Sequence, residues 1–235
     1  MPMETHSRAR ERPGRPLAKP ERDTRALLLN ATTALFAEQG VAATSFSTIA
    51  RRAGLTPAMV HYHFDDREQL IDAVVEERLV PFIHAVWDPV RPGLEPSELI
   101  RGLVQRLLEQ IGKAPWVPST WMREILNEGG LLRERIFRRL PFDRVRMVGH
   151  AIARGQAAGN ANLELDPLLL VFSTLGLVML HMATIGVWAG AFHRSRPSFK
   201  AMQRHITGLL LYGLSPVPDS AITANRRKRT SRRKS

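Results

Sequence analysis

The sequence predicts an all-α protein, on two observations. Apolar residues recur at helical spacing along most of the chain, and no run of strict apolar–polar alternation is long enough to indicate a sheet. Glycine and proline interrupt these amphipathic stretches where helices are expected to end or begin. A chain of 235 residues has room for a sizeable core, either as one domain or as a small domain fused to a larger one.

The N-terminal third begins with two predicted helices. The first runs from about residue 23 to Gln39 and has an apolar stripe made of Leu28, Ala31, Leu35 and Phe36. The second, of about two turns, has an apolar face made of Phe46, Ile49, Ala50 and Ala53. Gly40 and Gly54 follow the two helices, and glycine readily adopts the left-handed conformation that ends helices.

A third helix is expected from Pro57 to about His63, with Thr56 as its N-cap and with Val60 and Phe64 as apolar anchors. A short turn that contains glycine joins the helices of helix-turn-helix units, whose second helix enters the DNA major groove. An ordinary helical hairpin is the alternative. We expect base contacts from Thr56, Pro57, Ala58, Met59 and His61, and phosphate contacts from Thr44, Ser45 and Tyr62.

Residues 24–79, above all FAEQGVAATSFSTIARRAGLTPAMVHYHFDDREQL, resemble the DNA-binding domain of the tetracycline-repressor (TetR) family of bacterial transcription regulators. The resemblance implies a three-helix DNA-binding domain followed by a larger helical domain for ligand binding and dimerisation. It also implies that Arg67 touches the phosphate backbone, although a solvated first-turn charge is an equal alternative. The family commonly has an aromatic residue at position 61, where this chain has histidine.

The next helix is expected to link the two domains. Asp66 and Gln69 form a capping box at its start, and Pro81 should end or kink it. Because this helix, from Asp66 to about Val80, would connect the DNA-binding unit to the body, we expect it to transmit the regulatory signal between them.

The middle of the chain predicts further helices: 97–112 with Ser97 as cap, about 120–127, and 131–158 divided or kinked at Pro141. Aromatic and methionine side chains beside a few polar ones are typical of small-molecule cavities, although each is also an ordinary core residue. Residues 114–137 faintly resemble regulators that control drug-efflux transporters. The candidate ligand-binding residues are Trp116, Trp121, Met122, Glu124, His150, Phe172 and Met179.

The most apolar segment runs from Asp166 to Phe192 without a charged side chain after its first residue, and a last helix is expected over 198–212. A membrane span is one interpretation of its length, and a buried helix with small residues at a close contact is the other. Together the two helices would expose a large apolar surface, which predicts a homodimer with two-fold symmetry. The predicted interface residues are Gly176, Ala183, Gly186, Ile206 and Leu210.

The net charge of +12 lies mainly at the two ends of the chain. Residues 1–25 hold seven Arg/Lys and four Asp/Glu, and residues 226–234 hold seven Arg/Lys and no acidic residue. Gly14-Arg15-Pro16 resembles the core of an AT-hook, which would place Arg15 in the minor groove, with a plain solvated arm as the alternative. The expected segments are a disordered arm (1–22), the DNA-binding domain (23–65), the regulatory domain (66–215) and a disordered tail (216–235).

Enzymes and metalloproteins are disfavoured by what the sequence lacks. It has no nucleophile elbow, phosphate-binding loop, dinucleotide glycine pattern or zinc-protease motif, and His61 and His63 would point in different directions on a helix. We therefore expect no catalytic residues, metal site or cofactor. The absence of cysteine and the Arg-rich N-terminus favour the cytoplasm.

The sequence thus predicts a homodimeric regulator that binds double-stranded DNA, most simply a repressor released from a palindromic operator by a small-molecule inducer, with efflux genes as a suggested target and no membrane partner. Two alternatives remain. One is a helical protein that associates with membranes through 168–192 and its basic tails. The other is a DNA-compacting protein without sequence preference.

Overall fold

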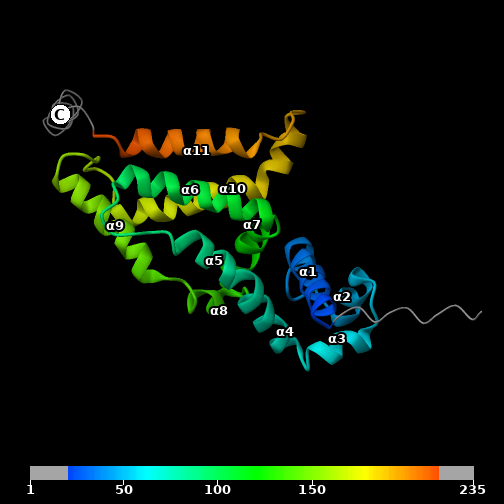
Figure 1. Ribbon diagram of the computed structural model, residues 1–235. Coiled ribbons are helices and arrows are strands. Elements are labelled where there is room, and N and C mark those ends of the chain that lie inside the picture. Colours follow the sequence, from blue (N-terminus) through cyan, green and yellow to red (C-terminus); the bar gives the residue numbers. More distant parts are fainter. Residues whose placement is uncertain (1–20, 217–235) are drawn as a thin grey trace, which may run out of the picture.

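A computed structural model describes residues 21–216, and these residues form helices without any strand, as the sequence predicts. Figure 1 shows a small helical unit joined to a larger helical body. In chain order the helices are α1 (Glu21–Gln39), α2 (Phe46–Ala53), α3 (Pro57–His63), α4 (Arg67–Val74), the π-helix η1 (Val75–Leu79), α5 (Val80–Trp87), α6 (Pro96–Lys113), α7 (Val117–Thr120), the π-helix η2 (Trp121–Ile125), α8 (Arg133–Phe137), α9 (Phe142–Ala157), α10 (Pro167–Ala191) and α11 (Phe199–Leu214).

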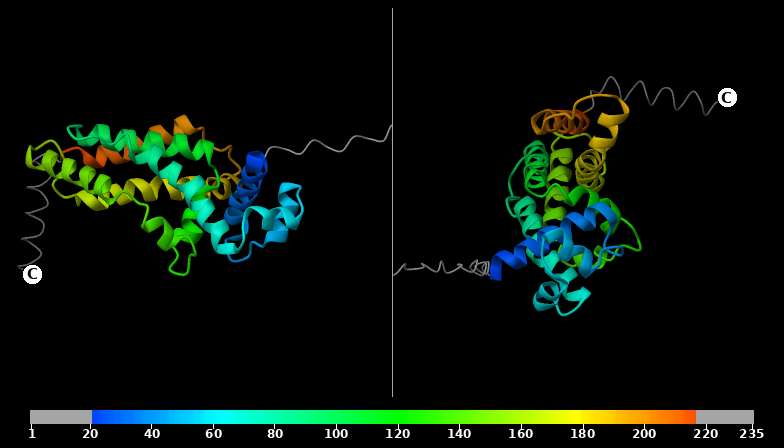
Figure 2. Two further views of the ribbon diagram at one scale, coloured as in Figure 1. Left: turned by 60° about the horizontal axis from the view of Figure 1, so that its bottom comes forward. Right: turned by 90° about the vertical axis from the view of Figure 1, so that its right-hand side faces the viewer.

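Helices α1, α2 and α3 form the small unit, which lies at one end of the molecule in Figures 1 and 2. Its core is made of the side chains that the helical spacing predicts, and the largest of them, Phe36 and Phe64, are at most 1% exposed. Gly40 and Gly54 both have positive φ angles, 86° and 68°, and end α1 and α2 as expected. The three short helices are therefore fixed by one shared core.

The body is organised around α6, which contacts α5, α9, α10 and α11. Its inward face is a continuous apolar stripe that includes Leu103, Leu107 and Ile111, all about 1% exposed. α6 begins at Pro96 with Glu95 as N-cap, two residues earlier than the expected Ser97 cap. The reason is a reciprocal capping box in which Glu95 and Glu98 each accept the other's backbone N–H.

The linking helix does not end at Pro81. α4, η1 and α5 form one continuous run, and the π-helical turn immediately before the proline makes the N–H of Val80 bond the carbonyl of Val75, five residues back. A π-turn widens the helix and relieves the loss of the N–H and the clash of the proline ring. Asp66 caps α4 by accepting from Gln69 N at 2.8 Å, and Gln69 Oε1 reaches back to Asp65 N rather than to Asp66.

The body departs from the expected pattern in one of its middle helices. The helix expected at 120–127 starts at Val117 and turns into η2, while Pro141 divides 131–158 into α8 and α9 as predicted. α10 packs on α6 and α9 with one face and leaves several of its large apolar side chains exposed, in line with the apolar surface that the sequence predicts.

The turn that follows η2 depends on the absence of a side chain at Gly130. A Cβ there would lie 2.0 Å from the carbonyl oxygen of Glu124, whereas a Cβ at Gly129 would meet nothing within 4 Å. We predict that Gly130→Ala destabilises the protein by about 1–3 kcal/mol because backbone must move, and lowers the Tm by about 2–4 °C per kcal/mol. Thermal unfolding of Gly130→Ala and of the control Gly129→Ala tests this prediction. An equal decrease of the Tm in the two variants would contradict it.

Candidate nucleic-acid interface

α3 presents one buried face and one exposed face. Val60 and the following Phe64 are fully buried, whereas Thr56, Pro57 and Ala58 at its start are exposed. The side chain of Thr56 is exposed and makes no capping hydrogen bond, so its hydroxyl is not used by its own helix. The N-terminal residues of a recognition helix are those that reach base edges, and this arrangement matches that requirement.

Later residues of α3 extend the exposed surface. His61 is exposed, and its ring packs edge-on against Phe46 of α2 with centroids 4.9 Å apart. Tyr62 is 71% exposed and its ring lies 5.2 Å from that of His63. Met59 is half-buried. The predicted base-contacting residues therefore lie on one helix, and His61 has a defined orientation that Phe46 imposes.

The start of α2 lies beside this surface. Ser45 is exposed and caps α2, with its hydroxyl oxygen accepting from Thr48 N at 3.2 Å. Arg52 bonds Glu38 (Nη1 to Oε1, 3.0 Å), which lowers the pKa of that carboxyl group. Arg51 is exposed, and its side chain makes no hydrogen bond or ion pair within residues 21–216. Sequence reasoning missed Arg51 as a phosphate-binding candidate, although its position opposite the apolar face of α2 would have indicated it.

One of the expected phosphate contacts is corrected by its surroundings. Thr44 is only 4% exposed and donates its hydroxyl to Gly40 O at 2.8 Å, so it stabilises the turn between α1 and α2. Arg67 is half-buried and donates one guanidinium N–H to the carbonyl of Val41 in the same turn, and its contact with phosphate stays a prediction. Both side chains satisfy backbone carbonyls of that turn. Arg15 lies outside the described residues.

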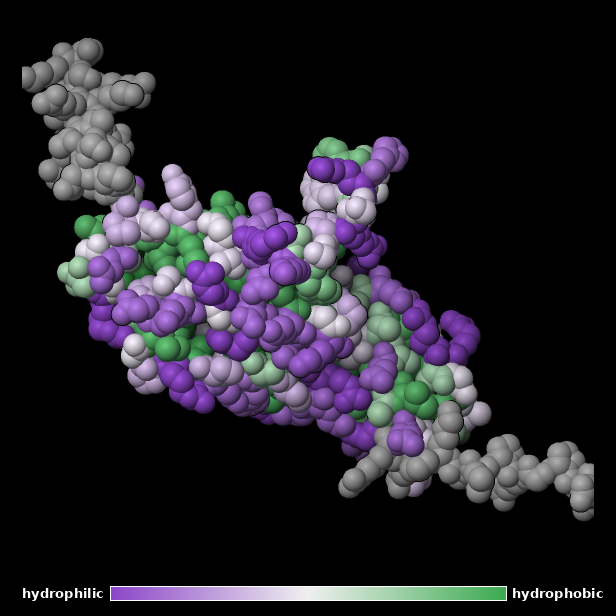
Figure 3. Space-filling model, turned by 45° about the horizontal axis from the view of Figure 1, so that its top comes forward, coloured by the Kyte–Doolittle hydropathy of each residue, from purple (hydrophilic) through white to green (hydrophobic). Residues whose placement is uncertain are grey.

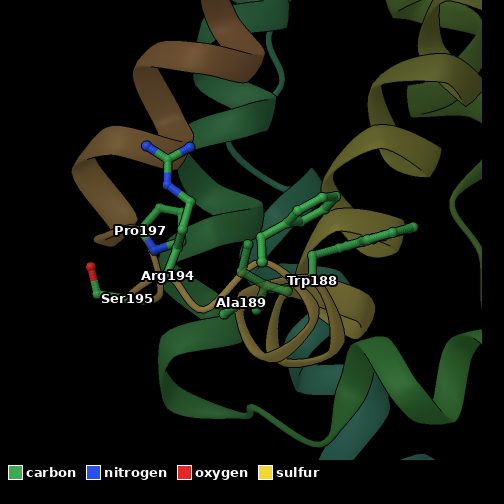
Figure 4. Close-up of a pocket in the computed structure, with 7 residues that line it drawn as sticks. Trp188, Ala189, Arg194, Ser195 and Pro197 are labelled. Atoms are coloured by element: carbon green, nitrogen blue, oxygen red, sulfur yellow. The ribbon is translucent and has the colours of Figure 1, made fainter.

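The body does not gather the seven candidate ligand residues around one cavity. Trp116 and Trp121 are partly buried against the core and Met179 is fully within it. Met122, His150 and Phe172 are exposed. None of the seven lines the apolar cleft at the end of α10, of about 340 Å³, whose residues Figure 4 shows on α10 and on the segment that leads to α11. The helices that carry these residues pack on one another, but some of the side chains lie in the core and others on the surface, which spacing along the chain does not reveal.

Glu124 has a different place from the one expected. It is 6% exposed, and its carboxylate accepts the N–H of Val41 at 2.9 Å and the N–H of Leu131 at 3.3 Å. Val41 belongs to the turn between α1 and α2, and Leu131 to the body. Glu124 is therefore a direct connection between the small three-helix unit and the body.

Two of the five predicted dimer residues are also corrected. Ile206 and Leu210 are buried within one chain, because α11 turns this face onto α6. On α10, Gly176 is exposed, and Ala183 and Gly186 are half-buried. The guanidinium of Arg196 lies over Gly186. The sequence analysis did not predict the larger exposed apolar side chains of α10 and α11 as interface residues.

A three-helix unit whose third helix faces outward, set on a larger helical body, defines a helix-turn-helix DNA-binding protein. The family model of the bacterial regulatory proteins of the tetR family matches residues 28–74. The HTH-type transcriptional regulator AcrR of Shigella flexneri is 28% identical over 144 residues, which are 60% of this chain and 59% of that protein. The family model and the curated relatives support a TetR-family transcription regulator, with the match centred on the DNA-binding unit.

Solved structures share the fold over most of the chain. KstR2, the ketosteroid transcriptional regulator of Mycobacterium tuberculosis, is 20% identical with a TM-score of 0.64, over 81% of this chain and 94% of that one. FadR of Bacillus subtilis, solved in complex with stearoyl-CoA, is 16% identical with a TM-score of 0.58, over 80% and 98%. By sequence, the chain spans about half the length of the curated relatives it matches, 48% and 59% for two of them.

An acidic substitution on α3 tests the interface. Ala58→Glu adds a negative charge in the first turn, which the helix dipole favours, so the fold should persist while repulsion from phosphate lowers DNA affinity by about tenfold or more. Ala153→Glu places the same charge on exposed surface of α9 and should bind DNA like the unmodified protein. Fluorescence anisotropy with labelled duplex measures both. Equal affinities would show that α3 does not face DNA.

Proposed function

We propose that this protein is a homodimeric, cytoplasmic transcription regulator, specifically a repressor that binds a roughly palindromic operator and leaves it when a small-molecule inducer occupies its body. The observation that carries DNA recognition is α3, which is anchored by the buried Val60 and Phe64 and exposes Thr56, Pro57, Ala58 and His61. Two such helices must lie about 34–36 Å apart, or a multiple of that, to enter successive major grooves.

The proposed dimer interface is the uncovered face of α10 and α11. On α10, Phe172, Leu180 and Val187 are 51%, 47% and 68% exposed and follow helical spacing along one side. On α11, Leu209 and Tyr212 are 54% and 88% exposed. Figure 3 shows hydrophobic side chains on the surface of the body, and the end of α10 standing out from it. An apolar face of this extent favours a self-complementary contact about a two-fold axis.

The same helix raises the membrane alternative. Among the described residues α10 alone has the length and composition to cross a membrane, with a mean hydropathy of 2.1 in its most apolar window, 28% of which is buried. One such helix is weak support, since core helices pass the same test. The opposite face of α10 packs on α6 and α9, and a lipid-surrounded helix would have to leave these partners. A one-sided stripe fits a second protein chain better than lipid on all sides.

We propose that the regulatory signal uses two connections between the body and the DNA-binding unit. The first is the continuous linking helix. It is held by Arg135 of α8, which donates to Asp72 (Nε to Oδ1, 2.6 Å), and by Arg139 of the turn after α8, which donates to Glu76 (Nε to Oε1, 2.8 Å). The second is Glu124 on the turn at Val41. To shift a dimer almost fully between two states, an inducer must prefer one by about 10⁴-fold, or about 5.5 kcal/mol.

The proposed site of the inducer is near η2. FadR of Bacillus subtilis was solved with stearoyl-CoA, which supports small-molecule binding by a body of this fold. Trp121 and Met122 lie on η2, three and two residues before Glu124, so a ligand that displaces them would also displace the carboxylate that holds the turn. The faint resemblance of 114–137 to regulators of efflux transporters favours efflux genes as targets.

The first experiment is binding of the full-length protein to DNA flanking its own gene, at about 150 mM salt with excess competitor DNA, where the non-specific contribution is weakened. A complex that resists competitor, and that a candidate inducer dissolves, is the expected result. Equal binding to all duplexes would favour a DNA-compacting protein instead. Sedimentation with lipid vesicles in the absence of detergent would favour the membrane alternative.

A charge on α10 tests the dimer. We predict that Leu180→Glu converts the dimer to a monomer, because two buried carboxylates would face each other near the two-fold axis, and that operator affinity falls with it. Leu163→Glu replaces an equally large and more exposed side chain, 73%, between α9 and α10 and should leave the dimer intact. Light scattering at a series of protein concentrations measures the mass. A dimer that survives Leu180→Glu would place the interface elsewhere.

Removal of the Glu124 carboxylate tests the second connection. Glu124→Ala leaves the N–H groups of Val41 and Leu131 without their acceptor, so we predict faster amide exchange in residues 40–45 and a free energy of unfolding lower by about 1–3 kcal/mol. The neighbour Glu128 is exposed, and its side chain makes no hydrogen bond or ion pair with other described residues, so Glu128→Ala is the control. Hydrogen exchange measured by mass spectrometry compares Glu124→Ala with Glu128→Ala. Unchanged exchange at residues 40–45 in both variants would contradict the connection.

A further inference from the structure

Arg25 of α1 connects three elements through one guanidinium group. Nη1 donates to the carbonyl of His63, the last residue of α3, at 3.1 Å. Nη2 and Nε donate to Oε1 of Glu77, in the linking helix, at 2.6 and 3.0 Å. The guanidinium carbon lies 4.6 Å from the centre of the Phe64 ring, which it covers. The recognition helix, the first helix and the linking helix therefore meet at this side chain.

The C-terminal end of α3 is where such a contact has most effect. The last carbonyls of a helix lack partners within it and carry partial negative charge, so a cation there is favourable. α3 has seven residues, too few for a helix that is stable alone, and its direction depends on tertiary contacts. The buried Phe64 anchors the end of α3 in the core of the small unit. The planar guanidinium of Arg25 links the same end to Glu77 in the linking helix.

We propose that Arg25 is a positioning residue for DNA recognition: with Glu77 as its anchor, it sets the angle between the recognition helix and the linking helix and does not bind phosphate. The proposal rests on the proposed function. Its consequence is that sequence-specific affinity depends on the Arg25–Glu77 pair, whereas non-specific affinity, which comes from phosphate contacts, does not.

The competing role for an arginine in α1 is a phosphate contact, and lysine separates the two. Lysine keeps the charge but loses the planar fork that bonds Glu77 and His63 at once. A phosphate contact should survive Arg25→Lys, whereas a positioning role should not. Glu77→Gln gives the converse: removal of a negative charge should strengthen a phosphate contact, but it weakens the anchor of a positioning residue.

The experiment measures binding of Arg25→Lys, Arg25→Met and Glu77→Gln to an operator duplex, selected from random sequences by the unmodified protein, and to an unrelated duplex over a series of salt concentrations. The matched control is Arg78→Lys. Arg78 lies next to Glu77 and contacts α1 through Asn30 and Ala26, but it makes no contact with α3 in the described residues. Thermal unfolding verifies that each variant is folded.

We expect Arg25→Lys and Arg25→Met to lose about tenfold or more in operator affinity, and Glu77→Gln to change in the same direction by less. Affinity for the unrelated duplex and the slope of affinity against salt should stay as they are, and Arg78→Lys should bind normally.

Full affinity in Arg25→Lys, with a slope reduced by about 0.9 in Arg25→Met, would overturn the proposal in favour of a phosphate contact. If Arg25→Met does not fold, Glu77→Gln decides, since tighter or unchanged operator binding there also overturns it. Failure of the unmodified protein to select any sequence would instead refute the proposed function.

Discussion

The backbone of Val41 is held from two sides, and the relation between the two parts of the molecule depends on it. Its N–H bonds the buried carboxylate of Glu124 in the body at 2.9 Å, and its carbonyl accepts from Arg67 at the start of the linking helix. A buried carboxylate is costly unless its oxygens are hydrogen-bonded, and both of its oxygens are, through Val41 and Leu131. The DNA-binding unit therefore cannot tilt against the body without breaking charge-assisted hydrogen bonds.

The linking helix gains its role from the same arrangement. Pro81 would stop an ordinary α-helix, but the π-turn at Val75–Leu79 lets it continue, so one rod joins the recognition unit to α6. Ion pairs from Arg25 on one side, and from Arg135 and Arg139 on the other, attach this rod to α1 and to α8 with the turn that follows it. Exposed pairs of this kind contribute little stability. In the proposed regulation, they would convert a movement of the body into a change in the angle of the linking helix.

Most of the fold could be predicted from the sequence, because local sequence signals set where its helices begin and end. Gly54 ends α2, Asp66 caps α4 and Pro141 precedes α9, each for a reason that acts over a few residues. The exposed residues of α3 were predictable for the same reason, since Val60 and Phe64 identify its buried side. The ligand and dimer residues were not. Ile206 and Leu210 form a good apolar stripe, but spacing cannot say whether α6 or a second chain covers it.

The sequence by itself determined the all-helical class, the helix-turn-helix unit and the boundaries that glycine, proline and capping residues impose, because these depend on backbone preferences and periodicity. Only the tertiary structure decided which polar groups are used inside the protein. Thr44, Arg67 and Glu124 have the chemistry of binding residues, yet each is bonded to a backbone group at the turn between α1 and α2. Buried backbone groups must be paired, and which side chain pairs them depends on contacts between residues as many as 83 positions apart.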